Sequence, residues 1–142
     1  MAATRRQRGA RKFYRMTMAS NPKNVHRVEK FLTNMSSVLK IGDEGFSTLL
    51  VVLTEAVNNA IIHGNKGNPA KKVVVTCIRE KDSLIVRVKD EGNGFNPDEI
   101  PNPVHEENLL RETGRGVFLM RQLMETVRYN KSGNEVTMRM KI

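Results

Sequence analysis

The chain of 142 residues lacks several features that would place it outside the cell or in a membrane. A single cysteine, Cys77, excludes an intrachain disulfide, and its place in an apolar run indicates a small core residue in a reducing compartment. No apolar run approaches the roughly 20 residues of a membrane-spanning helix, and the N-terminus has no signal-peptide pattern. These absences predict a cytoplasmic, single-domain protein with a hydrophobic core of its own.

Acidic residues are missing from the first 28 positions. Residues 1–28 carry eight cations, whereas residues 29–142 carry sixteen cations and fifteen acids. The net charge of +9 therefore belongs to the N-terminal end, and the rest of the chain is nearly neutral. We expect residues 1–12 to be a basic, disordered tail and residues 13–142 to be the domain. A tail that binds nucleic acid or an acidic partner is the alternative.

Strand and helix patterns follow each other without a regular βαβ order. We expect strands over 13–19, 72–79, 84–90 and 135–142, and helices over 21–39, over 44–63 and from 114 onward, the last with Val117, Met120, Met124 and Val127 on one face. This order predicts an α+β, two-layer sandwich with helices on one face of a mixed, largely antiparallel sheet. Residues 93–113, with three prolines and five acids, are typical of a lid or a disordered segment.

The second helix carries polar residues where a buried helix has none. Glu55 and Asn59 lie four residues apart, so they share a helix face, and His63 extends the same stripe. A carboxylate and an amide among apolar side chains are costly without partners. Loop backbone could satisfy both groups. The functional interpretation is an oxygen-rich site for a hard cation such as Mg²⁺, with a carboxylate that can act as a general base.

Two glycine motifs follow this helix. Asp90 is the last core-facing residue of its strand and precedes Gly92 and Gly94, which permit tight turns and close approach to a ligand. Alone, such an Asp is equally consistent with an ordinary hairpin turn. The segment 114–116, Gly-Arg-Gly, stands at an expected helix start, where exposed N–H groups and the helix dipole favour phosphate.

In this order and spacing, the three motifs resemble those of the GHKL superfamily of ATP-binding domains, which includes histidine kinases. The sequences of 55–64 and 114–120 are most similar to those of the bacterial anti-sigma-factor serine kinases. The resemblance covers 13–142 and implies the Bergerat fold, with ATP and Mg²⁺ as ligands. It implies these roles: Glu55 as catalytic base, Asn59 as Mg²⁺ ligand, Asp90 as acceptor for the adenine amino group, Gly92 and Gly94 beside adenine, and Gly114, Arg115 and Gly116 at the phosphates.

The chain departs from this family pattern at two places. Gly133-Asn134 stands where many relatives have Gly-Thr, so the resemblance does not extend to a hydroxyl contact with adenine. Arg115 replaces smaller or apolar residues, and it either reaches a phosphate or faces solvent.

Three functions remain open from the sequence. The first is an ATP-dependent serine/threonine kinase that acts as an anti-sigma factor and phosphorylates a small anti-anti-sigma (STAS-type) protein. The second is a nucleotide-gated regulator that sequesters a sigma factor without phosphotransfer. The third and weakest, a nucleic-acid-associated regulator, rests on the basic tail alone. The family also implies a homodimer, and no membrane partner is expected.

Overall fold

A computed structural model describes the backbone of residues 2–8, 11–93 and 112–142, and the side chains of 12–93 and 115–142. Its strands are β1 (Ala2–Arg8), β2 (Arg11–Ala19), β3 (Lys72–Glu80), β4 (Ser83–Lys89), β5 (Thr126–Tyr129) and β6 (Glu135–Lys141). Its helices are α1 (Arg27–Leu39), preceded by the 3₁₀ turn η1 (Pro22–His26), then α2 (Asp43–Asn59), continued by the π turn η2 (Ala60–Gly64), and α3 (Glu112–Leu123).

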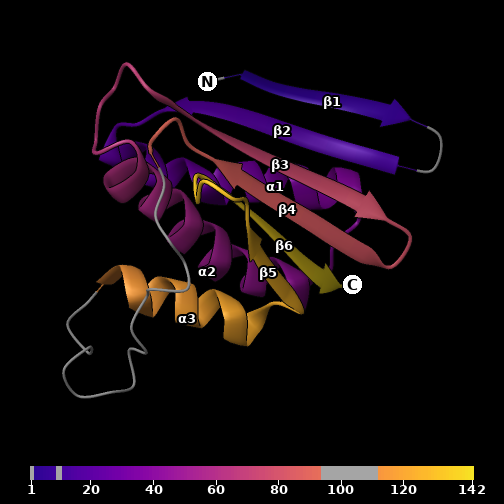
Figure 1. Cartoon of the computed structure of the whole chain (residues 1–142). Helices are drawn as coiled ribbons and strands as arrows, with labels where there is room; N and C mark the ends of the chain where they lie inside the picture. The colour runs from indigo at the N-terminus through magenta and orange to yellow at the C-terminus, as the bar shows by residue number, and fades with distance from the viewer. Residues whose placement is uncertain (1, 9–10, 94–111) are drawn as a thin grey trace.

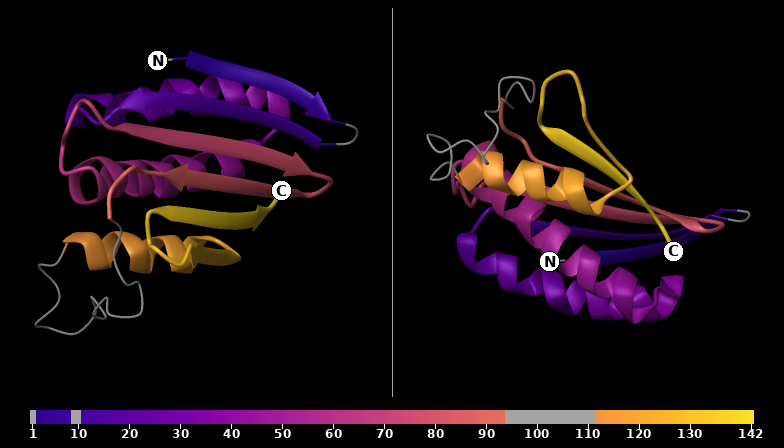
Figure 2. Two further views of the ribbon diagram at one scale, coloured as in Figure 1. Left: turned by 45° about the horizontal axis from the view of Figure 1, so that its top comes forward. Right: turned by 90° about the horizontal axis from the view of Figure 1, so that it is seen from below.

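The strands form one six-stranded sheet in the order β1-β2-β3-β4-β6-β5. Every neighbouring pair in the described sheet is antiparallel, so the sheet is not mixed. The three helices lie on one face of this sheet, and its other face carries no helix (Figures 1 and 2). The prediction of a two-layer α+β sandwich is confirmed.

The sequence explains where the helices begin and how they pack. Asn21 caps η1, because its side chain accepts a hydrogen bond from the N–H of Lys23 at 3.0 Å, and Pro22 fits the first turn. The expected apolar stripe of α1 is buried, including Val28, Leu32 and Met35. Helix α1 contacts α2, which in turn contacts α3, and the layer covers the sheet core.

Seven of the eight methionines lie in the core between the two layers. They come from β2, α1, the end of α3 and β6: Met16, Met18, Met35, Met120, Met124, Met138 and Met140. Methionine is unbranched and flexible, so it fills irregular space between helices and a twisted sheet. Cys77 is also fully buried, and burial raises the pKa of its thiol, as expected of an unreactive core residue.

The N-terminal segment is a strand over Ala2–Arg8, not the disordered tail that its composition predicts. Strand β1 pairs antiparallel with β2 from Ala2–Thr17 to Arg8–Arg11. The edge of β2 offers unpaired backbone N–H and C=O groups, and backbone pairing requires no apolar side chains. Composition therefore underestimates order in a basic segment that can join a sheet edge.

Two further expectations are wrong: the place of Val127 on the third helix, and the absence of an apolar run that approaches the length of a membrane-spanning helix. Val127 belongs to β5, where it pairs with Met138, and not to the third helix. Asp43–Gly64 is long and apolar enough, with a mean hydropathy of 1.5, to pass a length-and-composition test for a membrane span. In the structure this segment contacts α1, α3 and β4, so its apolar character matches its place in the helical layer.

Candidate functional site

Glu55 and Asn59 lie on α2, on the side toward α3. The amide nitrogen and the amide oxygen of Asn59 are both buried, and neither has a hydrogen-bond partner among the described residues. A buried amide without partners costs free energy, about 1–3 kcal/mol for each group. A ligand that enters here could satisfy both groups.

Gly116 of α3 lies directly against this pair. A Cβ atom at Gly116 would stand 2.8 Å from Oε2 of Glu55 and 3.1 Å from Nδ2 of Asn59. Only glycine therefore allows this approach without displacing the two polar side chains. Because α3 begins at Glu112, Gly114 and Gly116 lie within its first turns, and they do not open the helix as predicted. Arg115, between them, is exposed.

Asp90 follows β4 and is 8% exposed. Its Oδ1 accepts a hydrogen bond from the N–H of Gly92 at 2.8 Å, and its own N–H donates to the carbonyl of Asn134 at 2.9 Å. Burial raises the pKa of the Asp90 carboxyl, whereas the Gly92 N–H and the charge of Lys71 lower it. Asp90 is thus held in a fixed orientation with acceptor capacity left over.

Two glycines make room around Asp90. A Cβ atom at Gly64, at the end of η2, would overlap the Asp90 carboxylate, and one at Gly92 would overlap the Gly64 carbonyl. The predicted role of Gly92 in close backbone approach thus has a physical basis here. Gly94 and the predicted lid segment 94–111 lie outside the described residues.

Asn65 holds the loop that carries Gly64, and no pattern in the sequence pointed to this residue. Its Nδ2 donates to Oγ of Ser20 at 2.6 Å and to the carbonyl of Lys72 at 3.0 Å. Its Oδ1 accepts from the N–H of Glu91 at 2.8 Å. This single buried amide joins the ends of β2, β4 and η2 to the start of β3. Its position after Gly64 in a turn-like segment was the available signal.

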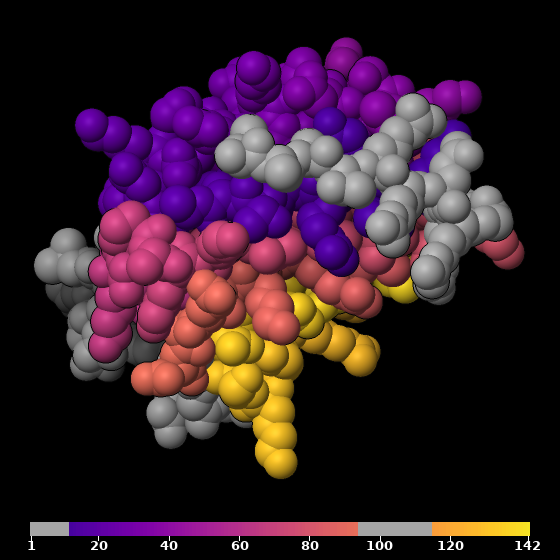
Figure 3. Space-filling view, turned by 90° about the horizontal axis from the view of Figure 1, so that it is seen from above, coloured from indigo at the N-terminus to yellow at the C-terminus, as the bar shows by residue number. Residues whose placement is uncertain are grey.

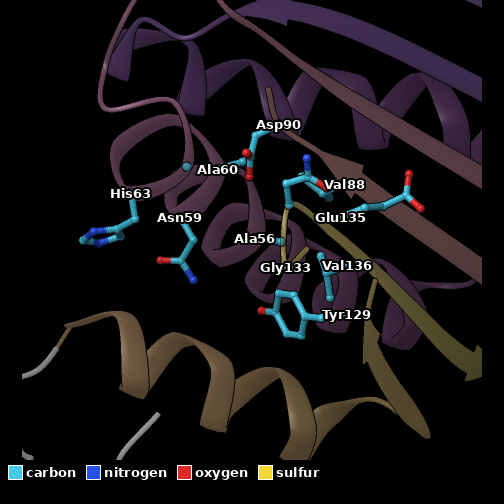
Figure 4. A pocket seen from close by; sticks show the side chains of 12 residues that line it. Ala56, Asn59, Ala60, His63, Val88, Asp90, Tyr129, Gly133, Glu135 and Val136 are labelled. Atoms are coloured by element: carbon cyan, nitrogen blue, oxygen red, sulfur yellow. The ribbon is translucent and has the colours of Figure 1, made fainter. Parts of the chain in front are cut away.

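A small cavity of about 30 Å³ lies between these groups, with Asp90 on one side and Tyr129 of β5 on the other (Figure 4). Asn59, the exposed His63 and Asn134 also line it. The cavity is thus narrow between Asp90 and Tyr129.

Tyr129 was missed because it lies in a short strand that the sequence pattern assigned to no element. Burial raises the pKa of its phenol to about 12; nearby Arg121 lowers it, and the Asp90 carboxylate raises it further. The phenol is thus a neutral group at the cavity under physiological conditions.

The predicted site residues form two adjacent groups. Glu55, Asn59 and Gly116 meet between α2 and α3, and Asp90 and Gly92 meet at the end of β4. The two groups border the same cavity, because Asn59 of the first and Asp90 of the second both line it. No cluster of three or more His, Cys, Asp or Glu side chains occurs in the described part of the chain. The donor set therefore suits a cation that takes its remaining oxygens from phosphates and water, as Mg²⁺ does.

Asn134 replaces the threonine that the family pattern has at its position. Its amide accepts from Asn130 and Ser132, at 2.7 and 3.1 Å, and donates to the carbonyl of Gly92 at 3.4 Å. Asn134 therefore links the β5–β6 turn to the loop after Asp90.

The sequence profile of the histidine kinase-like ATPase domain matches residues 18–140. The anti-sigma F factor of Bacillus cytotoxicus is 37% identical over 86 residues, which are 59% of this chain and 59% of that protein. The anti-sigma F factor of Oceanobacillus iheyensis is 30% identical over 102 residues, which cover 70% of this chain and 67% of that protein. The match thus spans less than two thirds of the Bacillus relative. With the profile covering most of the chain, this protein belongs to the histidine kinase-like ATPase domain family.

Proposed function

We propose that the protein binds ATP with Mg²⁺ and transfers the terminal phosphoryl group to a serine or threonine of a small partner protein. The observation that carries the proposal is the buried Asn59 amide, unpartnered among the described residues and held beside Glu55 under a glycine. Structural packing alone does not explain why such a costly group lies next to a carboxylate and a second, pre-oriented carboxylate at Asp90.

Asp90 is the proposed receptor for adenine. One carboxylate oxygen is fixed by the Gly92 N–H, and the carboxylate lines the cavity. An exocyclic amine is a donor, and an ionised carboxylate accepts strongly from it. Gly64 and Gly92 let the end of η2 and the loop after β4 pack directly against this carboxylate, which helps to hold it in place.

Glu55 and Asn59 are the proposed reaction centre. The Asn59 oxygen is a suitable ligand for Mg²⁺, which supplies charge neutralisation of the phosphates when it is bound. The Glu55 carboxylate, one helical turn away, orients the attacking hydroxyl and accepts its proton. Gly114 and Gly116 bring backbone close to the phosphates, and the exposed Arg115 is free to reach them. Catalysis of this kind is mainly positioning and electrostatics.

We further propose that the protein acts as an anti-sigma factor in the cytoplasm. The relatives at 30% and 37% identity are called anti-sigma F factors, and this supports a sigma factor as the partner that is inhibited. A small anti-anti-sigma protein of the STAS type is the proposed phosphoacceptor. Two copies of the chain are proposed to act as a homodimer.

The size of the cavity supports nucleotide gating as a second function. The cavity is narrow, so we expect a bound nucleotide to move Tyr129, Asn134 or the helices that frame the site. A ligand that is accommodated only after such movement shifts the population toward one conformation. Partner affinity would then depend on the bound nucleotide even without phosphotransfer.

The decisive experiment compares Glu55→Gln with Asn59→Ala. We expect Glu55→Gln to keep ATP affinity nearly intact and to lower phosphate transfer by about 10²–10⁴-fold, because only a base is lost. Asn59→Ala should weaken binding of Mg·ATP itself, because it removes the metal ligand. Calorimetry gives affinity, and radiolabelled ATP with a STAS-domain protein from the same organism gives transfer.

Two results would decide against the kinase assignment. Equal loss of ATP affinity in both variants would give Glu55 a structural role. Tight Mg·ATP binding by the wild type without transfer to any candidate partner would leave the nucleotide-gated regulator. Ser47→Ala, an exposed change on the same helix, is the control for folding of both variants.

A further inference from the structure

In the described part of the chain, no helix covers the sheet face opposite α1, α2 and α3 (Figure 2). In the space-filling view of Figure 3, the indigo-to-purple part of the chain lies above the red-to-yellow part. Antiparallel sheets often have one solvated face, which is then polar. The pairing register of this sheet shows which side chains that face carries.

Arginine and threonine alternate across the middle of this face. The register pairs Arg15 with Thr76, Thr76 with Arg87, Arg87 with Thr137, and Thr137 with Arg128. Paired residues point to the same side of a sheet, so these five form one row across β2, β3, β4, β6 and β5. Strands lie about 4.8 Å apart, which separates successive arginines of the row by about 10 Å. We call this row the arginine ladder.

An apolar row runs beside the ladder, two residues away on each strand. It pairs Phe13 with Ile78 and Ile78 with Ile85, and continues through Arg139 to Thr126. Ile85 is only 9% exposed although it points away from the main core. The row lies about 7 Å from the ladder. This face thus carries an apolar strip bordered by arginines, in which Phe13 and Ile78 are half-buried and Ile85 is almost buried.

A hollow of about 440 Å³ lies between these rows, lined among others by Phe13, Arg15 and Arg87. A third row, of Thr17, Val74, Lys89 and Glu135, lies on the other side of the ladder. Within β2 to β6, the three rows carry five cations and one acid: Arg15, Arg87, Lys89, Arg128 and Arg139 against Glu135. Glu135 pairs in register with Lys89. The face therefore combines an excess of positive charge with an apolar strip.

We propose that this face docks an acidic amphipathic helix of a partner protein, laid across the strands. Residues seven apart on a helix are about 10.5 Å apart along its axis, close to the spacing of the ladder arginines. Acidic side chains at that interval would each meet a guanidinium. Apolar side chains one turn away would cover Phe13, Ile78 and Ile85, which matches an interface with an apolar centre and a charged rim. The face lies across the sheet from the Glu55–Asn59 pair and so defines a second binding surface.

The composition of the face argues against two other occupants. A second copy of the chain would bring the same five cations against themselves, which disfavours association. Single-stranded nucleic acid needs aromatic platforms for its bases, and the strip offers only Phe13 beside aliphatic side chains. Both occupants remain outcomes of the test.

The test uses the full chain and a labelled helical peptide of three heptads, with glutamate once per heptad and a leucine stripe one turn away. Fluorescence anisotropy measures its affinity at about 0.05 M and 0.3 M salt. We expect a matched peptide with glutamine in place of each glutamate to bind about tenfold more weakly or worse. Arg87→Glu, at the centre of the ladder, should lower the affinity for the glutamate peptide to a similar degree.

Lys30→Glu is the control, because it makes the same charge change on exposed α1, in the helical layer. It should alter affinity by no more than about twofold. A peptide with lysine in place of its central glutamate should bind Arg87→Glu more tightly than the glutamate peptide does. The same peptide should bind the wild type more weakly than the glutamate peptide does. Equal binding of the glutamate and glutamine peptides, or equal effects of Arg87→Glu and Lys30→Glu, would overturn the proposal. So would tighter binding of an oligothymidylate, or a dimer of the wild type that Arg87→Glu dissociates in sedimentation.

Discussion

Asp90, the proposed receptor for adenine, lies where burial disfavours its ionised form. Replacement by Asn keeps its shape but exchanges an acceptor-only group for one that also donates. Loss of a charge-assisted hydrogen bond to adenine should cost about 1.5–3 kcal/mol, which is a tenfold to hundredfold weaker affinity for ATP. Calorimetry on the folded variant measures this directly, and wild-type affinity in Asp90→Asn would refute the adenine assignment.

The raised pKa of Asp90 also predicts a pH dependence of stability. A carboxyl whose folded-state pKa lies above its unfolded value favours the protonated form in the fold, so its ionisation lowers the free energy of unfolding. The wild type should therefore lose stability relative to Asp90→Asn as the pH rises from the ordinary Asp pKa through the raised one, and below the ordinary value the difference should no longer change with pH. Urea unfolding of both proteins from about pH 3 to pH 7 tests this. A difference that does not change with pH would contradict it.

Residue spacing was enough to select the groups that the structure brings together in the candidate site. Glu55 and Asn59 were recognisable because polar side chains interrupt an apolar helix, and Asp90 because it ends a core-facing row. Asn65 and Tyr129 could not be selected in this way. Their roles depend on which loop and which strand they meet in space, and neither breaks a local pattern.

At the scale of elements, the contact between α2 and α3 depends on Gly116. In Gly116→Ala, the added Cβ must displace the ends of the Glu55 and Asn59 side chains. The gain in helix propensity, about 1 kcal/mol, should offset much of the strain, so the stability should change little. ATP affinity should nevertheless fall severalfold, because both functional side chains move. Thermal unfolding and calorimetry separate the two effects.

Gln122→Ala is the matched control for Gly116→Ala, because Gln122 is exposed on the same helix. It should leave both stability and ATP affinity close to those of the wild type. A large loss of stability in Gly116→Ala would mean instead that the contact serves packing between the helices.

Long, periodic elements were predictable, and short ones were not. The stripe of α1 and the alternation of β3, β4 and β6 each persist for seven or more residues. Strand β5 has four residues, and Val127 continues the helical spacing of Val117, Met120 and Met124. Its strand conformation comes from pairing with β6, an interaction between segments that no local pattern encodes.

At the scale of the whole molecule, β1 and the nucleotide site lie toward opposite edges of the sheet. Deletion of residues 1–10 should expose the edge of β2, lower the melting temperature by several degrees and increase self-association. ATP affinity should not change, because β4, β5 and β6 frame the cavity. Scanning calorimetry, sedimentation and nucleotide titration give the three readouts. Unchanged stability would mean that residues 1–10 do not contribute to the fold.

Oxidation of the buried methionines can report on separation of the helical layer from the sheet. Peroxide converts an accessible thioether to the sulfoxide, a polar group that does not fit an apolar interior. The seven described methionines are almost fully inaccessible, so each should resist peroxide until the layers separate. Their oxidation, followed by mass spectrometry, should therefore be slow and cooperative across the sheet and the helices. If ATP stabilises the closed fold, it should slow the oxidation of all seven together.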